Sequence, residues 1–345
     1  MAKQTSLVFF ARLFYPHIGG VEKHVLEIGK RFAKQGYLLT VITENYQSLP
    51  ITARIEGINI VRLNVGKDDW FKKFRIWKEL LKNIQIIRNA DIIHCHDVFF
   101  WYLPFKFIFL FKEVYTTFHG YEGNKIPDRK EYIVRKIAEK LSRGNICIGN
   151  FYQKWYGTKA TFVSYGAVDR KLIEEGLNPI KPTKEAMFLG RLEEETGIIE
   201  YLVAIKDKRL KLDVFGEGSL EKKAREYVNK NKLDVKFKGF VENATDYIKD
   251  YKYLFTSRYL GILEGMALKK PVFALYNNKI KKDYLEMTAF SSYISISKDG
   301  SHLSKQLDNY LGGKSKINTA GAYEWVSDKT WENLLDIYKT LWRIS

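Results

Sequence analysis

Short apolar segments and amphipathic segments alternate along the chain. The apolar runs Ser6–Phe10 and Leu38–Thr43 have the length and composition of buried strands. Between them, apolar residues recur at the three- and four-residue spacing of a helix from Val21 to Phe32, and Gly36 ends the pattern. A strand, a helix and a second strand in this order predict a parallel pair of strands joined by a right-handed crossover.

The alternation continues through the rest of the chain. Further strand-like runs are Ile58–Leu63, Ala90–His94, Val114–Phe118, Asn145–Gly149, Thr161–Ser164, Ala186–Leu189, Leu210–Phe215, Tyr253–Ser257 and Pro271–Leu275. Arg170–Lys184 contains two prolines and is the segment most typical of a linker. A length of 345 residues is enough for two domains of ordinary size. We therefore expect an α/β protein with domains at residues 1–170 and 171–320 and a final helical segment at 321–345.

The chain is strongly basic, with a formal net charge of +17. Residues 1–170 contain 27 basic and 15 acidic side chains, so most of the excess lies in the first half. Such a charge favours anionic partners, namely nucleic acid, acidic lipid surfaces or phosphorylated substrates. The sequence contains no zinc-finger, ribonucleoprotein or basic-zipper pattern, which argues against nucleic acid.

Two features bear on where the protein resides. Cys95 and Cys147 lie in apolar strand-like runs, so we expect them to be buried and reduced, as in a cytoplasmic protein. The longest apolar stretch, Val98–Phe111, is too short to span a bilayer and contains Pro104 and Lys106. We recognise no signal peptide and expect a cytoplasmic protein without a membrane-spanning helix.

The segment Trp70–Arg88 is amphipathic and allows two interpretations. Trp70, Phe74 and Trp77 fall on one face of a helix, whereas lysine and arginine side chains fall on another. The apolar face either packs on a sheet, as in an ordinary domain helix, or lies on an anionic membrane surface, because tryptophan paired with lysine suits that interface. The aromatic run Val98–Phe111 either belongs to the core or extends such a membrane-facing surface.

A glycine turn, Gly19 and Gly20, joins the first predicted strand to the first helix. Backbone N–H groups at a helix N-terminus bind anions, and two glycines allow a ligand to approach closely. The surrounding sequence PHIGGVEKHVLEIGKRFAKQGYLLTVIT resembles the opening of the retaining glycosyltransferases of family 4, which have the GT-B fold. In that family the turn faces the phosphates and sugar of a nucleotide-sugar donor across a cleft.

The resemblance implies two Rossmann-like domains that face each other across this cleft. Residues 1–170 are then expected to form the acceptor-side domain, and residues 171–320 the donor domain. The donor nucleotide is expected mostly on the second domain, at the carboxyl ends of its strands. The segment 321–345 is expected to be a helix that returns to the first domain.

Later motifs resemble the family's donor site. In GRLEEETG, Arg191 follows a strand, where its guanidinium could hold a diphosphate. In ILEGMA, we expect Glu264 in the first turn of a helix whose free N–H groups point at phosphate from about Gly261 onward. The Glu264 carboxylate either accepts ribose hydroxyls or simply stabilises the helix dipole. The other donor-binding candidates are Gly216, Glu217, Phe240, Val241, Ile262 and Leu263.

Two positions depart from the family pattern. Thr196 stands where the family has a lysine, and Thr256 stands where it has the first of two glutamates. We expect Arg258, which is close in sequence to the phosphate-facing helix, to supply the missing cation, so Arg191 and Arg258 are catalytic candidates. The alternative is a degenerate relative that binds nucleotide sugar without turnover.

Histidines occur at two predicted strand ends. His119, in TFHGYEG, resembles the family histidine that contacts the donor sugar near the acceptor, and it is the third catalytic candidate. His94 and His96 project to the same side of a strand, as metal ligands do. Since no third ligand with metal-ligand spacing is evident in the sequence, we expect neither a metal nor a cofactor.

The sequence thus predicts a metal-independent glycosyltransferase of hexosyltransferase type. It is expected to move a sugar from a UDP- or GDP-linked donor to an acceptor hydroxyl with retention. The charge and the aromatic segments favour a lipid or lipid-linked acceptor at the anionic inner face of the cell membrane, as in polysaccharide or glycolipid biosynthesis. An inverting transferase, an epimerase, a nucleotide-sugar-binding pseudoenzyme and a nucleic-acid-binding protein are the alternatives.

Overall fold

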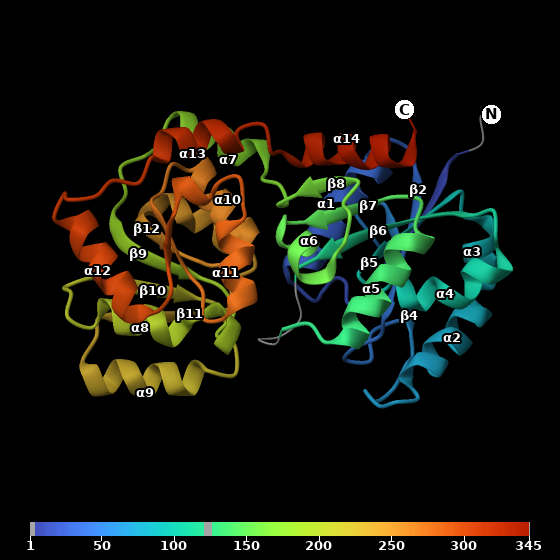
Figure 1. Ribbon diagram of the computed structural model, residues 1–345, viewed down its shortest axis with the longest axis horizontal. Helices are drawn as coiled ribbons and strands as arrows, with labels where there is room; N and C mark the ends of the chain where they lie inside the picture. The colour runs from blue at the N-terminus through green and yellow to red at the C-terminus, as the bar shows by residue number, and fades with distance from the viewer. Residues whose placement is uncertain (1–3, 121–125, 345) are drawn as a thin grey trace.

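The computed structural model describes residues 4–120 and 126–344, which form two α/β domains side by side (Figure 1). The first domain contains an eight-stranded sheet in the order β3-β4-β2-β1-β5-β6-β7-β8, parallel except for the β3–β4 pair. Its strands are β1 (Ser6–Ala11), β2 (Leu38–Glu44), β3 (Thr52–Ile55), β4 (Ile58–Leu63), β5 (Ile92–His96), β6 (Glu113–His119), β7 (Asn145–Ile148) and β8 (Phe162–Ser164).

The second domain contains a six-stranded parallel sheet in the order β11-β10-β9-β12-β13-β14. Its strands are β9 (Lys184–Leu189), β10 (Leu212–Phe215), β11 (Val235–Gly239), β12 (Tyr251–Phe255), β13 (Val272–Leu275) and β14 (Ser295–Ser297). Two Rossmann-like parallel sheets confirm the expected α/β fold.

Helices cover the sheets in both domains (Figure 1). The helices up to the domain junction are α1 (Gly20–Lys34), α2 (Lys72–Lys82), α3 (Ile84–Asn89), α4 (Phe99–Ile108), α5 (Arg129–Leu141), α6 (Phe151–Tyr156) and α7 (Arg170–Leu177). Those that follow are α8 (Ile198–Ile205), α9 (Glu221–Asn231), α10 (Tyr259–Ala267), α11 (Lys279–Glu286), α12 (Gly300–Leu311), α13 (Thr319–Val326) and α14 (Trp331–Trp342). Short 3-10 helices occupy Glu194–Thr196, Ala244–Asp250 and Ser291–Tyr293.

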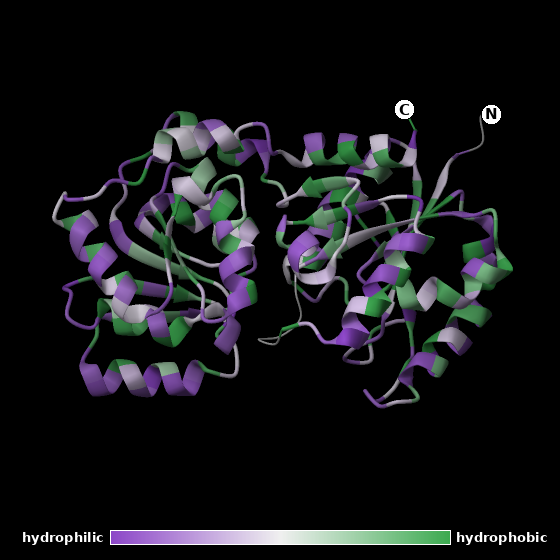
Figure 2. Cartoon of the chain, viewed as in Figure 1, coloured by the Kyte–Doolittle hydropathy of each residue, from purple (hydrophilic) through white to green (hydrophobic). Residues whose placement is uncertain are grey.

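The central strands are buried on both faces, which explains their nearly continuous apolar sequences. In β1, all residues from Leu7 to Ala11 are buried, and in β5 all five residues are buried. Cys95 and Cys147 are buried and unpaired, as expected. By contrast, α9 lies on the outside of the second domain and is largely hydrophilic (Figure 2).

The C-terminal helix α14 leaves the second domain and packs against α1 and β8 of the first domain (Figure 1). At the crossing, the Val168 N–H donates to the Lys329 carbonyl at 2.9 Å, and the Trp331 N–H donates to the Val168 carbonyl at 3.3 Å. The helix that was expected to return to the first domain is therefore present. The preceding helix, α13, packs against α10 and stays with the second domain.

The segment predicted as a linker is only partly a linker. Its first half forms α7 (Arg170–Leu177), which packs against α10. This packing depends on Gly176, because a Cβ at that position would overlap the carbonyl oxygen of Ala267 in α10. Only residues 178–183 connect α7 to β9 without regular structure.

The amphipathic segment Trp70–Arg88 is not one helix, because it is divided into α2 and α3. The buried residues of α2 are Ile76 and Leu80, whereas Trp70 and Phe74 are exposed. Of the two interpretations, packing of the tryptophan face on the sheet therefore does not hold for these two side chains. Within residues 4–120 and 126–344, every helix is too short or too polar to cross a bilayer.

Replacing Gly176 with alanine should destabilise the second domain, because the added methyl group separates α7 from α10. Overpacking of this kind typically costs about 1–3 kcal/mol, and it would oppose the gain of about 1 kcal/mol that alanine brings to a helix. Urea unfolding of Gly176→Ala and of Glu174→Ala, an exposed site on the same helix, provides the comparison. A Gly176→Ala protein as stable as the Glu174→Ala control would contradict the close packing of α7 on α10.

Candidate active site

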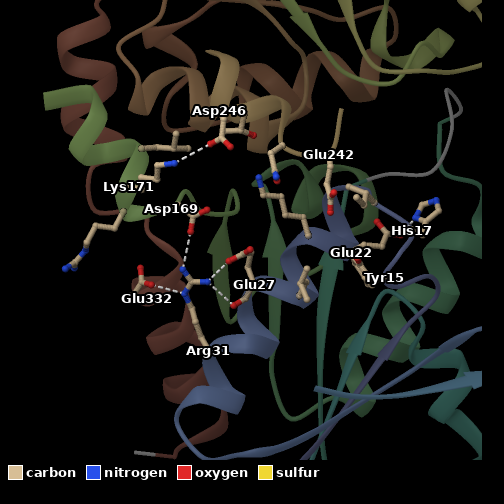
Figure 3. A pocket seen from close by; sticks show the side chains of 17 residues that line it. Tyr15, His17, Glu22, Glu27, Arg31, Asp169, Lys171, Glu242, Asp246 and Glu332 are labelled. Atoms are coloured by element: carbon tan, nitrogen blue, oxygen red, sulfur yellow. Dashed lines mark hydrogen bonds and ion pairs between the residues drawn. The ribbon is translucent and has the colours of Figure 1, made fainter. Parts of the chain in front are cut away.

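A cavity of about 500 Å³ lies between the two domains, beside α1 (Figure 3). On the first-domain side it is lined by Glu22 and Lys23, from the first turn of α1. On the second-domain side it is lined by Glu242 and Asp246, which follow β11. The cavity therefore lies beyond the carboxyl ends of strands from both sheets, where ligands bind in open α/β folds.

Arg31 joins three elements at the far end of this cavity (Figure 3). Its guanidinium contacts Glu27 of α1 at 2.5 Å, Glu332 of α14 at 2.8 Å, and Asp169, just before α7, at 3.3 Å. These ion pairs connect the first domain to both segments of chain that cross between the domains. Sequence analysis did not identify Arg31, because its partners lie up to 301 residues away.

The glycine turn is at the start of α1, as expected, but an anion from the chain itself already lies there. The Glu22 carboxylate folds back over Gly19, so that a Cβ on Gly19 would overlap it. His17 Nδ1 is 3.2 Å from the same carboxylate. Burial raises the pKa of Glu22, although hydrogen bonding and His17 oppose this shift. Across the cleft, Gly20 faces Leu260, whose Cδ1 is 3.9 Å from the position of a Cβ on Gly20.

Glu264 lies in the second turn of α10, not in the first turn as predicted. Its side chain is buried and accepts a hydrogen bond from Lys23 Nζ at 2.6 Å, across the domain interface. Burial alone would lower the pKa of Lys23, but the charge of Glu264 outweighs it and raises that pKa. Because dipole effects fade beyond the first turn of a helix, the alternative role of Glu264 as a dipole-stabilising carboxylate does not hold.

The N-terminus of α10 is at Tyr259, three residues earlier than Ile262, where the sequence placed it. The Tyr259 N–H donates to the Tyr284 hydroxyl at 3.0 Å, and the Ile262 N–H donates to the Arg258 carbonyl at 3.0 Å. In the first turn, the N–H groups of Leu260 and Gly261 thus lack partners within the helix. The side chains of Ile262 and Leu263 are fully buried, and their role in donor binding stays a prediction.

One carboxylate brings Arg191 and Arg258 together. Glu195 Oε1 is 2.7 Å from Arg191 Nη2 and 3.4 Å from Arg258 Nη2. Arg191 follows β9 and Arg258 follows β12, and these two strands are neighbours in the sheet. The two guanidiniums therefore meet at the carboxyl-terminal edge of the sheet, an arrangement suited to a diphosphate.

Lys281, which was not recognised from the sequence, adds a third basic side chain behind this pair. Its Nζ donates to the backbone carbonyl of Glu195. Burial lowers the pKa of Lys281 to about 7, and the positive charge of Arg258 acts in the same direction. Lys281 thus supports the loop that carries Arg191 and Glu195.

Thr196 and Thr256, the two threonines at positions that differ from the family pattern, have structural roles. Thr196 Oγ1 lies 2.5 Å from the Arg191 carbonyl oxygen and 2.7 Å from that of Glu193, inside the turn after β9. Thr256 Oγ1 donates to the Leu189 carbonyl at 2.9 Å. Both hydroxyls therefore fix the local backbone.

The other predicted donor residues follow β10 and β11. Gly216 has a φ of +139°, and a Cβ there would overlap the carbonyl of Gly190, so only glycine fits. Glu217 Oε1 accepts from the Phe240 N–H at 3.0 Å, which links the two loops. Phe240 is exposed and Val241 is half-buried. These residues lie at the same sheet edge as Arg191.

His119 ends β6 and belongs to a cluster with His24, His94 and His96. His96 Nδ1 is 2.9 Å from His119 Nε2, and the rings of His24 and His119 are 4.7 Å apart. Burial lowers the pKa of His24 to about 3 and holds the pKa of each other histidine well below its ordinary value. All four rings are therefore neutral at physiological pH. Residues 121–123, the end of the TFHGYEG motif, lie outside the described residues.

This cluster contains a third nitrogen-bearing side chain that the sequence did not reveal beside His96 and His119. His24, His96 and His119 each offer a nitrogen atom, and these atoms lie within 4.8 Å of one another. In tetrahedral zinc sites, with bonds of 2.0–2.1 Å, ligand nitrogens are about 3.3 Å apart. The 2.9 Å separation of His96 and His119 is instead that of a hydrogen bond between neutral rings.

Comparisons with known proteins agree with this architecture. Residues 18–159 match the family model described as Glycosyltransferase Family 4. An uncharacterized glycosyltransferase of Methanocaldococcus jannaschii is 27% identical over 296 residues, which cover 77% of this chain and 78% of that protein. Sucrose-phosphate synthase from Thermosynechococcus elongatus superposes with a TM-score of 0.76 at 15% identity, over 99% of this chain and 98% of that one.

A further solved structure is that of Anabaena HepE in complex with UDP and glucose. It superposes with a TM-score of 0.76 at 14% identity, over 99% of this chain and 100% of that one. The structural matches show the fold. The family model and the Methanocaldococcus relative, both described as glycosyltransferases, indicate the activity. The protein is therefore a glycosyltransferase with the GT-B fold, and its residues 18–159 are similar to Glycosyltransferase Family 4.

Proposed function

We propose that the protein transfers a sugar from a nucleotide-sugar donor to the hydroxyl of an acceptor, with retention of anomeric configuration. The observation that carries this proposal is the convergence of Arg191 and Arg258 beside the start of α10. Cations and free N–H groups at one sheet edge suit the diphosphate of such a donor. The UDP and glucose bound by Anabaena HepE support a UDP-linked sugar, and a GDP-linked sugar fits the same chemistry.

Transfer leaves negative charge on the departing diphosphate, and this charge must be stabilised in the transition state. In our proposal the diphosphate takes the place of the Glu195 carboxylate between Arg191 and Arg258. The N–H groups of Leu260 and Gly261 add donors from the start of α10. These groups stabilise the leaving charge without a metal ion.

The proposal gives two further residues a role. Glu264 accepts the ribose hydroxyls when its present partner, Lys23, moves away. His119 contacts the donor sugar from the first domain. Retention rests on the resemblance of the glycine turn and the Arg191 loop to retaining enzymes. A pseudoenzyme with the same site would bind the nucleotide sugar but would release no nucleotide diphosphate.

Replacing Glu264 with glutamine should weaken the binding of UDP or GDP, because a charge-assisted hydrogen bond to the ribose is lost. The expected loss is about 1–3 kcal/mol of binding free energy. Isothermal titration calorimetry on wild type, Glu264→Gln and Glu226→Gln measures it, where Glu226 is an exposed carboxylate on α9. Equal affinity in the wild type and a folded Glu264→Gln variant would remove Glu264 from the site.

Replacing Arg258 with alanine should lower kcat more than it raises KM, because the leaving charge is greatest in the transition state. A decrease of about 100-fold in kcat is typical when one such donor is lost. Release of nucleotide diphosphate is measured for wild type, Arg258→Ala and Arg225→Ala, an arginine on α9 that pairs with Glu221. Full turnover in Arg258→Ala would contradict its role, and no turnover in the wild type would favour a pseudoenzyme.

We also propose that the first domain attaches to an anionic membrane surface and takes a lipid or lipid-linked acceptor there. The supporting observation is a set of exposed apolar side chains on and beside the neighbouring helices α2 and α4. Trp70 is 68% exposed and Phe111 is 99% exposed. We call this set the aromatic patch, and its members are Trp70, Phe71, Phe74, Leu81, Phe107, Ile108, Leu110 and Phe111.

The basic residues next to the aromatic patch are of two kinds. Lys72 pairs with Glu44 at 2.9 Å, and Arg75 pairs with Asp69 at 2.9 Å, so both are held by the domain itself. Lys73 instead lies over the Trp70 ring, with Nζ 4.2 Å from its centroid. A lysine beside a tryptophan in this way suits the headgroup region of a bilayer. The membrane test therefore uses Lys73 and the exposed Lys78.

Vesicle co-sedimentation tests this attachment. Binding should require anionic lipid and fall with added salt, and the double variant Lys73→Gln/Lys78→Gln should bind about 30-fold more weakly, since each charge contributes about 1 kcal/mol. Trp70→Ser/Phe74→Ser should also weaken binding, because the inserted rings are lost. The control Lys222→Gln/Lys223→Gln changes the same charge on α9. Equal sedimentation with neutral and anionic vesicles, or none with either, would contradict membrane attachment.

A further inference from the structure

A buried chain of hydrogen bonds runs from the C-terminal helix to the histidine cluster. Trp342 Nε1 is 3.1 Å from His94 Nδ1, and His94 Nε2 is 2.7 Å from Thr117 Oγ1. Thr117 Oγ1 is 2.9 Å from the Tyr338 hydroxyl, which is 2.8 Å from His24 Nε2. All five side chains are buried, so these contacts are shielded from water. Trp342 and Tyr338 belong to α14, whereas the other three belong to the first domain.

The first link of the chain has only one possible direction. An indole nitrogen donates and cannot accept, so His94 Nδ1 must be the acceptor and carry no proton. Burial holds the pKa of His94 well below its ordinary value, so the ring is neutral and has a single proton. That proton is therefore on Nε2, and His94 donates it to Thr117.

The directions of the next two hydrogen bonds follow from the two hydroxyl groups that they involve. When Thr117 accepts from His94, its own proton is free to go to Tyr338, and the Tyr338 proton goes to His24 Nε2. Each hydroxyl in this order donates once and accepts once. In the opposite order Thr117 would accept twice, and its proton would have no partner among these contacts, which is costly in a buried site. His24 Nε2 is therefore an acceptor, and the proton of His24 is on Nδ1.

The direction of the hydrogen bond between His96 and His119 can be assigned as well. His96 Nε2 is buried and has no hydrogen-bond partner among the described residues. A buried N–H without a partner is rarer than a buried acceptor without one, so the proton of His96 is on Nδ1. His96 then donates to His119 Nε2. The proton of His119 is consequently on its other nitrogen, Nδ1.

We propose that Trp342 and Tyr338 of α14 are positioning residues, which set the tautomer and orientation of His24 and thereby hold the neighbouring ring of His119, whose proton is on Nδ1, in place. The His24 ring contacts the His119 ring edge-on, with centroids 4.7 Å apart, so a change in its orientation reaches His119 directly. The catalytic consequence rests on the proposed function, in which His119 meets the donor sugar. The tautomers themselves do not depend on it.

Nuclear magnetic resonance of protein labelled with ¹⁵N-histidine reads the tautomers directly, without any substrate. Long-range ¹H–¹⁵N spectra distinguish a ring protonated at Nδ1 from one protonated at Nε2. We expect His94 protonated at Nε2, and His24 and His119 protonated at Nδ1. Tyr338→Phe removes one oxygen atom and should convert His24 to a mixture of tautomers, and Trp342→Phe should do the same to His94.

Trp331→Phe is the matched control. Trp331 is buried on the same helix, and its ring lies 5.8 Å from that of His24, but its indole N–H has no hydrogen-bond partner among the described residues. This variant therefore changes packing against His24 without removing a link of the chain, and all four tautomers should stay as in the wild type. If Trp342→Phe does not fold, Tyr338→Phe decides the question, since it preserves the ring.

Kinetics provide the second measurement. Tyr338→Phe should lower kcat about 10-fold, with KM for the nucleotide sugar changed less than about 2-fold, because misplacing a group at the reacting centre affects turnover. Trp331→Phe should have no comparable effect on kcat. Wild-type His24 protonated at Nε2, or an unchanged His24 in Tyr338→Phe, would overturn the assignment of the chain. If the tautomers change as expected but kcat does not, the catalytic role of His119 is overturned, and the assigned directions of the hydrogen bonds still hold.

Discussion

The cleft depends on one constraint, namely that a buried charge must be paired. Glu264 is buried at the interface, and Lys23 of the opposite domain pairs with it at 2.6 Å. A buried carboxylate without such a partner would be strongly destabilising. At the more exposed end of the site, Glu195 lies within ion-pair distance of both Arg191 and Arg258. In this structure the Glu195 carboxylate thus supplies the negative charge that the diphosphate of a nucleotide sugar is proposed to supply, and Lys23 occupies the position proposed for the ribose hydroxyls.

This constraint relates the fold to the chemistry. Cations that are already held in place by carboxylates need little reorganisation when a diphosphate replaces those carboxylates. The arrangement also connects substrate binding to the position of the domains, because the Lys23–Glu264 pair crosses the interface. Arg31 and α14 hold the domains together near the other end of α1, so the domains remain connected when that pair opens.

The features that the sequence could predict were local. The strand–turn–helix pattern identified the glycine turn, and the end of the preceding strand identified Arg191. Both could be found because the spacing of apolar residues and the residue types of a turn depend on only a few neighbouring positions. Lys23 and Glu195 were missed, since each is defined by a partner on a distant element. The only signal for Lys23 was a charged residue just after the glycine turn.

The errors have equally physical causes. The start of α10 was placed at Ile262, but the helix begins earlier, where the Tyr259 N–H donates to the Tyr284 hydroxyl. The apolar face of the Trp70 segment was compatible with burial. No local rule could show that Ile76 and Leu80 are the residues of this helix that are buried instead. For the histidines, spacing within one strand showed two of the rings, and only the fold brings His24 and His119 to them.

A crystal structure of the protein with bound UDP would test this account most directly. The account predicts that the diphosphate lies between Arg191 and Arg258 in place of the Glu195 carboxylate. It also predicts that the ribose hydroxyls contact Glu264 and that Lys23 is no longer within ion-pair distance of it. A nucleotide bound elsewhere, or bound while the Lys23–Glu264 and Arg191–Glu195 pairs keep their distances of 2.6 and 2.7 Å, would contradict the account.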